Sequence, residues 1–327
     1  MPHRRQLPAL ALGLVAAPAI GRRAAAQADF PNRPIRVIVP YSAGGGTDLT
    51  TRLLMEAIRP ALGQPIVVEA RPGANGIIGS DAVARSEPDG YTLVAVTSGH
   101  VINKYTMPNV PFDPVRDFTA VSLMTRFALV LVGGTTTPFT DMRGALAFAR
   151  ANPGELTVGS TTALGSVTAQ EFARAAQIRI TEVPYRGGGQ MTLDIMSGTV
   201  QTGFTSPQSA TPHLKSGRMR ILGISSAERA IQLPEVPTIA ESGVPGFEST
   251  SWFGILGPAN MPLPIAQKIH DAIEAAMQDP TTRARAIELG CDGKVEGPGA
   301  FAAIIRGDDA KWQKARSEGL LPNQVSR

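Results

Sequence analysis

Residues 35–63 read IRVIVPYSAGGGTDLTTRLLMEAIRPALG. The first five residues form a short apolar run rich in β-branched side chains, which suits a strand buried on both faces. Three glycines follow a short turn, and apolar side chains then recur at helical spacing as far as Leu62. Gly63 supplies a helix stop, and Thr47 or Asp48 is the expected N-cap. The stretch therefore predicts a strand, a glycine-rich turn and a helix.

This glycine-rich turn has the chemistry of an anion site. The first N–H groups of a helix lack internal partners, and the helix dipole is positive at that end. Glycines also let a ligand come close to the backbone. Taken alone, the turn is equally compatible with a plain tight connection between strand and helix, so the choice rests on the remaining sequence.

Length and composition are typical of a globular α/β chain with room for two domains. The chain has 327 residues, of which 43% are hydrophobic and only 5% aromatic, and this disfavours a nucleic-acid surface built on base stacking. Residues 1–28 hold four of the 31 basic residues and no acid. Without them, 27 basic residues balance 27 acidic ones, so we expect no nucleic-acid partner.

Residues 1–28 are typical of a secretory signal. The segment opens with paired arginines, continues with an apolar run that two prolines interrupt, and ends in an A-x-A cleavage site. Cleavage after Ala28 is expected, by a twin-arginine or a general route. Cys291 is the single cysteine, so no internal disulfide can form and stability must come from the packed core.

After the first unit, strands and helices alternate along the chain. Strands are expected at residues 65–69, 91–96, 121–132, 156–158, 181–185, 200–204, 221–225 and 251–256. Helices are expected at residues 77–86, 142–151, 167–176, 190–196, 265–277, 281–289 and 301–317. The alternation predicts an α/β fold with mainly parallel sheets. We expect the chain to cross between domains near residue 128 and to return near 251, which gives one domain of residues 29–128 plus 251–327 and another of residues 129–250.

The second half of the chain repeats the opening pattern. Small-residue loops follow its strands at residues 159–166, 186–189 and 205–206. In open α/β sheets, ligands bind beyond the carboxyl ends of the strands. Two such domains facing each other form a cleft that a hinge can close on a small anion. The repetition favours an anion site over a plain turn.

Signatures of catalysis and of cofactor binding are missing from the sequence. It has no phosphate-binding loop, dinucleotide fingerprint, nucleophile elbow or paired metal-ligand spacing. We therefore expect no cofactor, no metal and no enzymatic activity. His213 and His270 are expected at the surface and Trp312 in the core. His100 is a candidate to face the cleft, where an exported hydrolase would need it beside a nucleophile such as Ser98.

Several longer motifs carry a family resemblance. They are VPYSAGGGTD, LGQPIVVEARPGANGIIG, PDGYTL, FDPVRDF, VPYRGG, LPEVPTIAESGVPGF and the Lys311-Trp312 pair, in this order. Nearly the whole mature chain thereby resembles the Bug-type (TctC-like) periplasmic substrate-binding proteins of tripartite tricarboxylate transporters. The resemblance implies a two-domain periplasmic-binding-protein (type II) fold with a hinged cleft. It also implies a monomeric periplasmic receptor that passes a small carboxylate, held by backbone N–H groups and water, to a permease of one large and one small membrane subunit.

The resemblance also implies ligand contacts on both sides of the cleft. Those of the first domain would be Tyr41, Ser42, Ala43, Gly44, Gly45, Asp48, Thr97 and Ser98. Those of the second domain would be Ser160, Thr161, Thr162, Gly165, Ser166, Tyr185, Arg186, Gly187, Gly188, Thr205 and Ser206.

The sequence departs from the family pattern at three places. Ser42-Ala43 stands where the family has proline before its glycine pair, and Ser166 stands where it carries a histidine. Thr205-Ser206 replaces the Asp-Asn often found there. An acid at that position could receive a ligand ammonium group, so we expect a carboxylate ligand without an amino group.

Other functional classes remain as alternatives. A receptor of this kind could present its ligand to a histidine kinase instead of a permease. An exported hydrolase has no motif in its favour. A transcription-factor effector domain of the same fold is disfavoured by the predicted signal segment and by the lack of a helix-turn-helix pattern.

Overall fold

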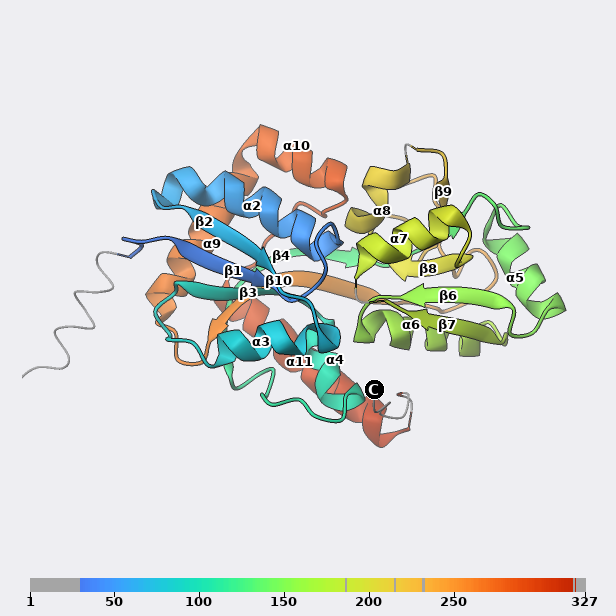
Figure 1. Ribbon diagram of the computed structural model, residues 1–327, viewed down its shortest axis with the longest axis horizontal. Coiled ribbons are helices and arrows are strands. Elements are labelled where there is room, and N and C mark those ends of the chain that lie inside the picture. The colour runs from blue at the N-terminus through green and yellow to red at the C-terminus, as the bar shows by residue number, and fades with distance from the viewer. Residues whose placement is uncertain (1–29, 186, 215, 231–232, 320, 322–327) are drawn as a thin grey trace, which may run out of the picture.

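The computed structural model describes residues 30–185, 187–214, 216–230, 233–319 and 321. The predicted signal segment and Arg186 therefore lie outside the described residues. The chain forms two five-stranded sheets that lie side by side, each covered by helices (Figure 1). Within the described residues, none of the helices combines the length and the apolar run needed to cross a membrane.

The first sheet has the strand order β2-β1-β3-β10-β4. Its strands are β1 (Ile35–Val39), β2 (Ile66–Ala70), β3 (Thr92–Thr97), β4 (Phe118–Ala128) and β10 (Thr250–Pro258). β1 pairs in parallel with β2 and β3, whereas β10 is antiparallel to both β3 and β4. The helices of this domain are α2 (Gly46–Leu62), the short 3-10 turn η1 (Ala74–Gly76), α3 (Ile77–Ala84), α4 (Gly99–Thr106), α9 (Leu263–Gln278), α10 (Pro280–Leu289) and α11 (Pro298–Ser317).

The second sheet repeats this plan in the order β7-β6-β8-β5-β9. Its strands are β5 (Val130–Gly134), β6 (Leu156–Ser160), β7 (Ile180–Pro184), β8 (Thr202–Thr205) and β9 (Met219–Ile224). β6 is parallel to β7 and β8, and β5 is the antiparallel strand. Its helices are α5 (Met142–Ala151), α6 (Ala163–Ala175), α7 (Gly188–Ser197) and α8 (Pro207–Leu214). Two α/β domains of this kind form the periplasmic-binding-protein fold that the sequence predicts.

The opening stretch forms the strand, turn and helix that its pattern predicts. Val37 and Ile38 have no exposed surface, as expected for a strand covered on both faces. α2 ends where Gly63 adopts a left-handed φ of 66° and its N–H donates to the carbonyl of Arg59. The predicted N-cap was wrong: Gly45 takes that position, and Asp48 instead accepts a hydrogen bond from the N–H of Gly44 over 3.0 Å.

Two chain crossings connect the domains. Leu129 joins β4 to β5, so the expected long crossing strand is divided there. The return crossing begins at Ser249, whose N–H donates to the carbonyl of Ser225 over 2.8 Å. Ser225 in turn donates its N–H to the carbonyl of Leu129 over 2.8 Å. Ser225 therefore links the two crossings, and the strands that lead into them pair directly where Thr250 of β10 lies opposite Ala128 of β4.

Two helices beside the cleft were not predicted. α4 follows β3 directly, and α8 follows β8 directly. Each has eight residues, and α8 contains Pro212. Trp312 is buried, as predicted.

Candidate functional site

A small cavity lies between the domains, where loops from the carboxyl ends of both sheets meet. The space in it that the centre of a water molecule can reach is about 50 Å³. The residues that line it are Tyr41, Ser42, Gly45, Gly46, Thr47, Thr97, Phe127, Leu129, Thr161, Thr162, Leu164, Gly165, Gly187, Gly188, Phe204, Thr205, Ser206, Ser209, Ser251 and Phe253.

Helix N-termini from both domains converge on this cavity. The first residues of α2, α6, α7 and α8 line it or adjoin its lining, and α4 begins two residues after Thr97. A β-carbon on Gly45 would lie 3.8 Å from the backbone nitrogen of Gly188, and one on Gly99 would lie 3.8 Å from that of Ala163. The helix starts therefore meet in pairs across the cleft, α2 with α7 and α4 with α6. Each pair brings together N–H groups of two helix N-termini and the positive ends of two helix dipoles.

The hydroxyl groups in the cavity are oriented by the backbone. Ser209 Oγ accepts hydrogen bonds from the N–H of Gly46 over 2.6 Å and from Ser206 Oγ over 3.2 Å. Thr162 Oγ1 accepts from the N–H of Gly165, and Thr97 Oγ1 from that of Gly99. A hydroxyl has one proton and two lone pairs. Because these bonds use lone pairs, the hydroxyls keep their protons for an acceptor in the cavity.

The electrostatic field in the cavity favours negative charge. None of its described lining residues has an ionisable acidic or basic group apart from the phenol of Tyr41. The nearby Asp48 is directed into its own loop, where it accepts from Gly44 and pairs with Arg52 over 2.9 Å. Burial raises the pKa of the Tyr41 phenol, which therefore stays a neutral hydroxyl. Dipoles and donors thus dominate the field, and an anion is the ligand that such a field favours.

One wall of the cavity is apolar. The rings of Phe127 and Phe253 come from the hinge strands β4 and β10, and their centroids are 4.4 Å apart. Phe204, Leu129 and Leu164 extend this wall, and all five side chains are buried. A ligand in the cavity would therefore face donors on several sides and hydrocarbon on another.

The structure brings many of the predicted site residues together. Those that line the cavity are Tyr41, Ser42, Gly45, Thr97, Thr161, Thr162, Gly165, Gly187, Gly188, Thr205 and Ser206. Those outside its lining are Ala43, Gly44, Asp48, Ser98, Ser160, Ser166 and Tyr185. Arg186 is outside the described residues.

Several of the outlying residues are committed to other partners. Ser160 Oγ donates to Glu182 over 2.6 Å, and the Tyr185 hydroxyl donates to Asp194 over 2.9 Å. Ser98 Oγ is hydrogen-bonded to Ser251 Oγ over 2.8 Å. Ala43 and Gly44 are exposed. These side chains stabilise the loops around the cavity without lining it.

Sequence reasoning missed part of the lining. The missed residues are Gly46, Thr47, Phe127, Leu129, Leu164, Phe204, Ser209, Ser251 and Phe253. Gly46 and Thr47 directly follow Gly45 in the sequence, and this position next to a predicted site residue could have identified them. The aromatic side chains lie in apolar strands whose pattern does not separate a core position from a cavity wall.

His100 does not face the cleft. It is 1% exposed and packs against Phe112 and Phe118, with ring centroids 5.2 and 4.7 Å away. Burial lowers its pKa to about 3. Its Nε2 has no hydrogen-bond partner among the described residues. The Ser98–His100 pair that a hydrolase would need is therefore not formed.

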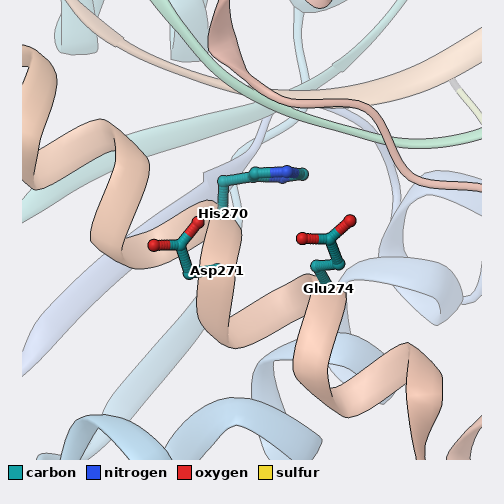
Figure 2. A group of neighbouring side chains, drawn as sticks. All are labelled: His270, Asp271 and Glu274. Atoms are coloured by element: carbon teal, nitrogen blue, oxygen red, sulfur yellow. The ribbon is translucent and has the colours of Figure 1, made fainter.

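A group of possible metal ligands lies on α9, away from the cavity lining. Figure 2 shows His270, Asp271 and Glu274, with the two carboxylates on opposite sides of the histidine. The surface prediction for His270 was wrong: the residue is 5% exposed, and its Nδ1 is 3.0 Å from Ser122 Oγ. Asp271 accepts a hydrogen bond from Gln267 over 2.7 Å. These bonds, together with the packing of Gly297 against Nε2, account for the group as part of the fold of the first domain.

Comparison with known proteins identifies relatives over most of the chain. A family model described as the tripartite tricarboxylate transporter family receptor matches residues 50–315. Protein BugT of Bordetella pertussis is 32% identical over 288 residues, which are 86% of this chain and 88% of BugT.

Solved structures share the same architecture. A Rhodopseudomonas palustris protein solved with adipate has a TM-score of 0.85 and 30% identity, and the match covers 89% of this chain and 99% of that one. MatC of the same organism, solved with bound malate, has a TM-score of 0.81 and 28% identity, with 88% of this chain and all of MatC covered.

Proposed function

The chain belongs to the tripartite tricarboxylate transporter family of receptors, and from this premise we propose that it binds a small dicarboxylate between its domains and delivers it to a membrane permease. The family is one of periplasmic solute-binding receptors and not of enzymes. The ligand, the contacts and the permease are the new parts of the proposal.

The observation that carries the proposal is the pairing of helix N-termini across the cleft. One pair lies at Gly45 and Gly188, and the other at Gly99 and Ala163. Because both pairs join the two domains, an anionic group at each would draw the domains together. Two such places suit a ligand with two carboxylates, and the apolar wall suits the hydrocarbon between them. The adipate and malate bound by the two similar structures are both dicarboxylates.

The residues with donors at the cavity receive the following roles. The backbone N–H of Gly188 holds one carboxylate, with the hydroxyl of Ser209 as a further donor. The first turn of α6 and the hydroxyl of Thr162 hold the other. Ordered water completes the shell. The outlying Asp48 and Tyr185 act by positioning the loops.

The lining also limits the ligand class. Thr205 and Ser206 offer hydroxyls where a carboxylate would be needed to receive an ammonium group. An ammonium ion would also meet the positive ends of the helices. We therefore propose that the ligand has no amino group.

A thermal-shift screen of the purified protein tests this proposal. Adipate, malate and succinate form the test set, aspartate and glutamate carry the added amino group, and the diamine cadaverine is the charge control. A ligand at a hundredfold excess over its Kd should add about 2.7 kcal/mol to the free energy of unfolding. Stabilisation by amino acids alone would refute the ligand class, and no shift with any acid would refute the function.

The cellular role can be tested separately. We propose that the signal segment is cleaved after Ala28 and that the mature receptor is a monomer. We also propose that the chain passes from the first domain to the second at Leu129 and returns near Thr250. N-terminal sequencing of the exported protein and its mass in solution check the first two. Deleting the gene should abolish uptake of the acid if the receptor serves a permease. Lost transcriptional response with intact uptake would instead support the sensor alternative.

A further inference from the structure

A second contact joins the domains outside the cavity lining. There, α8 of the second domain packs against α2 and α10 of the first (Figure 1). Gln208 of α8 has no exposed surface, and its Nε2 donates to the carbonyl of Gly290 over 2.8 Å. A β-carbon on Gly290 would lie 3.0 Å from Cβ of Pro207, so the two backbones are in close contact. Gln208 and Gly290 do not line the cavity.

The single cysteine lies directly behind this contact. Cys291 is 2% exposed, and its Sγ is 3.9 Å from Thr50 Oγ1. Thr125 and Gln208 also lie next to the thiol. Thr50 and Thr125 belong to the same domain as Cys291, whereas Gln208 belongs to the other. Separation of the domains would therefore remove Gln208 and open that side of the thiol to water.

The Gln208 amide is only half satisfied. Its Oε1 is buried and has no hydrogen-bond partner among the described residues. A buried acceptor without a hydrogen-bond partner destabilises the state in which it is buried, and water would hydrogen-bond to it in the open form. The amide bond to Gly290 acts in the opposite direction. Because the two contributions oppose each other, the contact stabilises the closed form by less than the amide bond alone would.

From this geometry we infer that Gln208 is a positioning residue that latches the closed domains at Gly290, and so sets ligand affinity without touching the ligand. The inference deepens the proposed function and rests on it for the identity of the ligand. The latch itself is a contact between the domains and can be measured without any ligand.

Gln208→Glu is the sharpest variant because it keeps the shape of the side chain. It removes the donor to Gly290, sets an oxygen against that carbonyl and buries a charge, but only in the closed form. With adipate and malate as probes in calorimetry, we expect the Kd to rise about tenfold or more. Gln278→Glu makes the same chemical change at an exposed position on α9 and should leave both Kd values unchanged.

Labelling of Cys291 by iodoacetamide supplies the second readout. Without ligand, Gln208→Glu should label about tenfold faster than the wild type, while Gln278→Glu should match the wild type. Saturating adipate or malate should slow labelling of the wild type, and this measurement needs no variant to fold.

The outcomes separate the two ideas. The latch is refuted if an acid binds the wild type without slowing the labelling of Cys291, and if Gln208→Glu changes neither the labelling rate nor the Kd. If no acid binds the wild type but Gln208→Glu still accelerates labelling, the latch stands and the proposed function falls.

Discussion

The backbone N–H of Gly46 donates to the hydroxyl of Ser209 over 2.6 Å, a bond between residues 163 positions apart in the sequence. Gly46 is the first residue of α2, and Ser209 lies in the first turn of α8, so the bond ties the two domains together at the cavity. Because Ser209 Oγ accepts in this bond, its own proton remains available for another acceptor.

Ser209→Ala should weaken carboxylate binding about tenfold, because it removes the interdomain bond and one donor to a charged group. Titration calorimetry with the acid found in the screen measures the change. Ser197→Ala is the control, since Ser197 is an exposed serine of α7 whose hydroxyl bonds only within its own domain. Equal Kd values for Ser209→Ala and the wild type would contradict the assigned role.

Gly187→Ala should block closure of the cleft. Gly187 has φ 176°, which any residue adopts, but a β-carbon there would overlap the side chain of Ser42 in the other domain. Affinity should fall at least about tenfold, while the melting temperature of the ligand-free protein stays the same. This follows because the overlap exists only when the domains meet.

A compensating change tests whether that overlap is the cause. Ser42→Gly removes the partner β-carbon, so the double variant with Gly187→Ala should regain much of the lost affinity. Gly299→Ala adds a β-carbon where no neighbour lies within 4 Å and should bind normally. A double variant as weak as Gly187→Ala would show that another effect is responsible.

The sequence predicted the helices with strong periodicity and most of the strands. The helix of residues 142–151 was placed at its observed bounds, and the Gly63 stop is confirmed. α4 and α8 were missed because each is short, and Pro212 interrupts the pattern of α8. Both helices begin at a strand end, where their role depends on the neighbouring domain.

About half of the residues that line the cavity could be predicted from loop patterns in the sequence. The other half are brought to the cavity by tertiary packing. Gly45 and Gly188 could be predicted because small residues after a strand have a local signature. Phe127 and Phe253 could not, since only the sheet register brings the two hinge strands together and turns both rings to the cavity. Ser209 required knowledge of α8. His270 was misplaced because a polar residue in an amphipathic helix is usually exposed, and its bond to Ser122 has no sequence signal.

Thr162→Ala should separate the capping role of this residue from its role in binding. Thr162 caps α6, and Asp141 caps α5 by accepting from the N–H of Gly144 over 2.7 Å. Either cap replaced by alanine should cost about 1 kcal/mol of stability in urea unfolding. Only Thr162→Ala should also raise the Kd for the acid, by about tenfold. An equal loss of affinity in Asp141→Ala would mean that the effect is general destabilisation.

His100 should make folding sensitive to mild acid. Its folded pKa is about 3 because burial disfavours the charged ring, whereas the unfolded value is near 6.5. Below pH 6.5 the unfolded chain therefore binds a proton that the folded chain does not. The stability that the protein has with His100 neutral is fully present above pH 6.5. As the pH falls toward 3, the free energy of unfolding decreases by about 1.4 kcal/mol per pH unit. Urea unfolding at pH 6.5, 5.5 and 4.5 should show this slope, and His100→Gln should flatten it. An unchanged slope in the variant would assign the acid sensitivity to other groups.

Thr205→Asp should change the class of ligand that the cavity accepts. Thr205 lines the cavity and is 3% exposed, so a carboxylate there would be largely removed from water beside the helix N-termini. It would repel one carboxylate of a simple diacid and could pair with the ammonium group of an amino acid. We therefore expect affinity for adipate or malate to fall more than tenfold, and aspartate or glutamate to gain measurable binding. Thr205→Asn keeps the shape without the charge and should show neither a gain for amino acids nor a comparable loss for diacids. If Thr205→Asn and Thr205→Asp bind alike, the charge of the cavity does not select against the amino group, and the assigned ligand class loses its electrostatic basis.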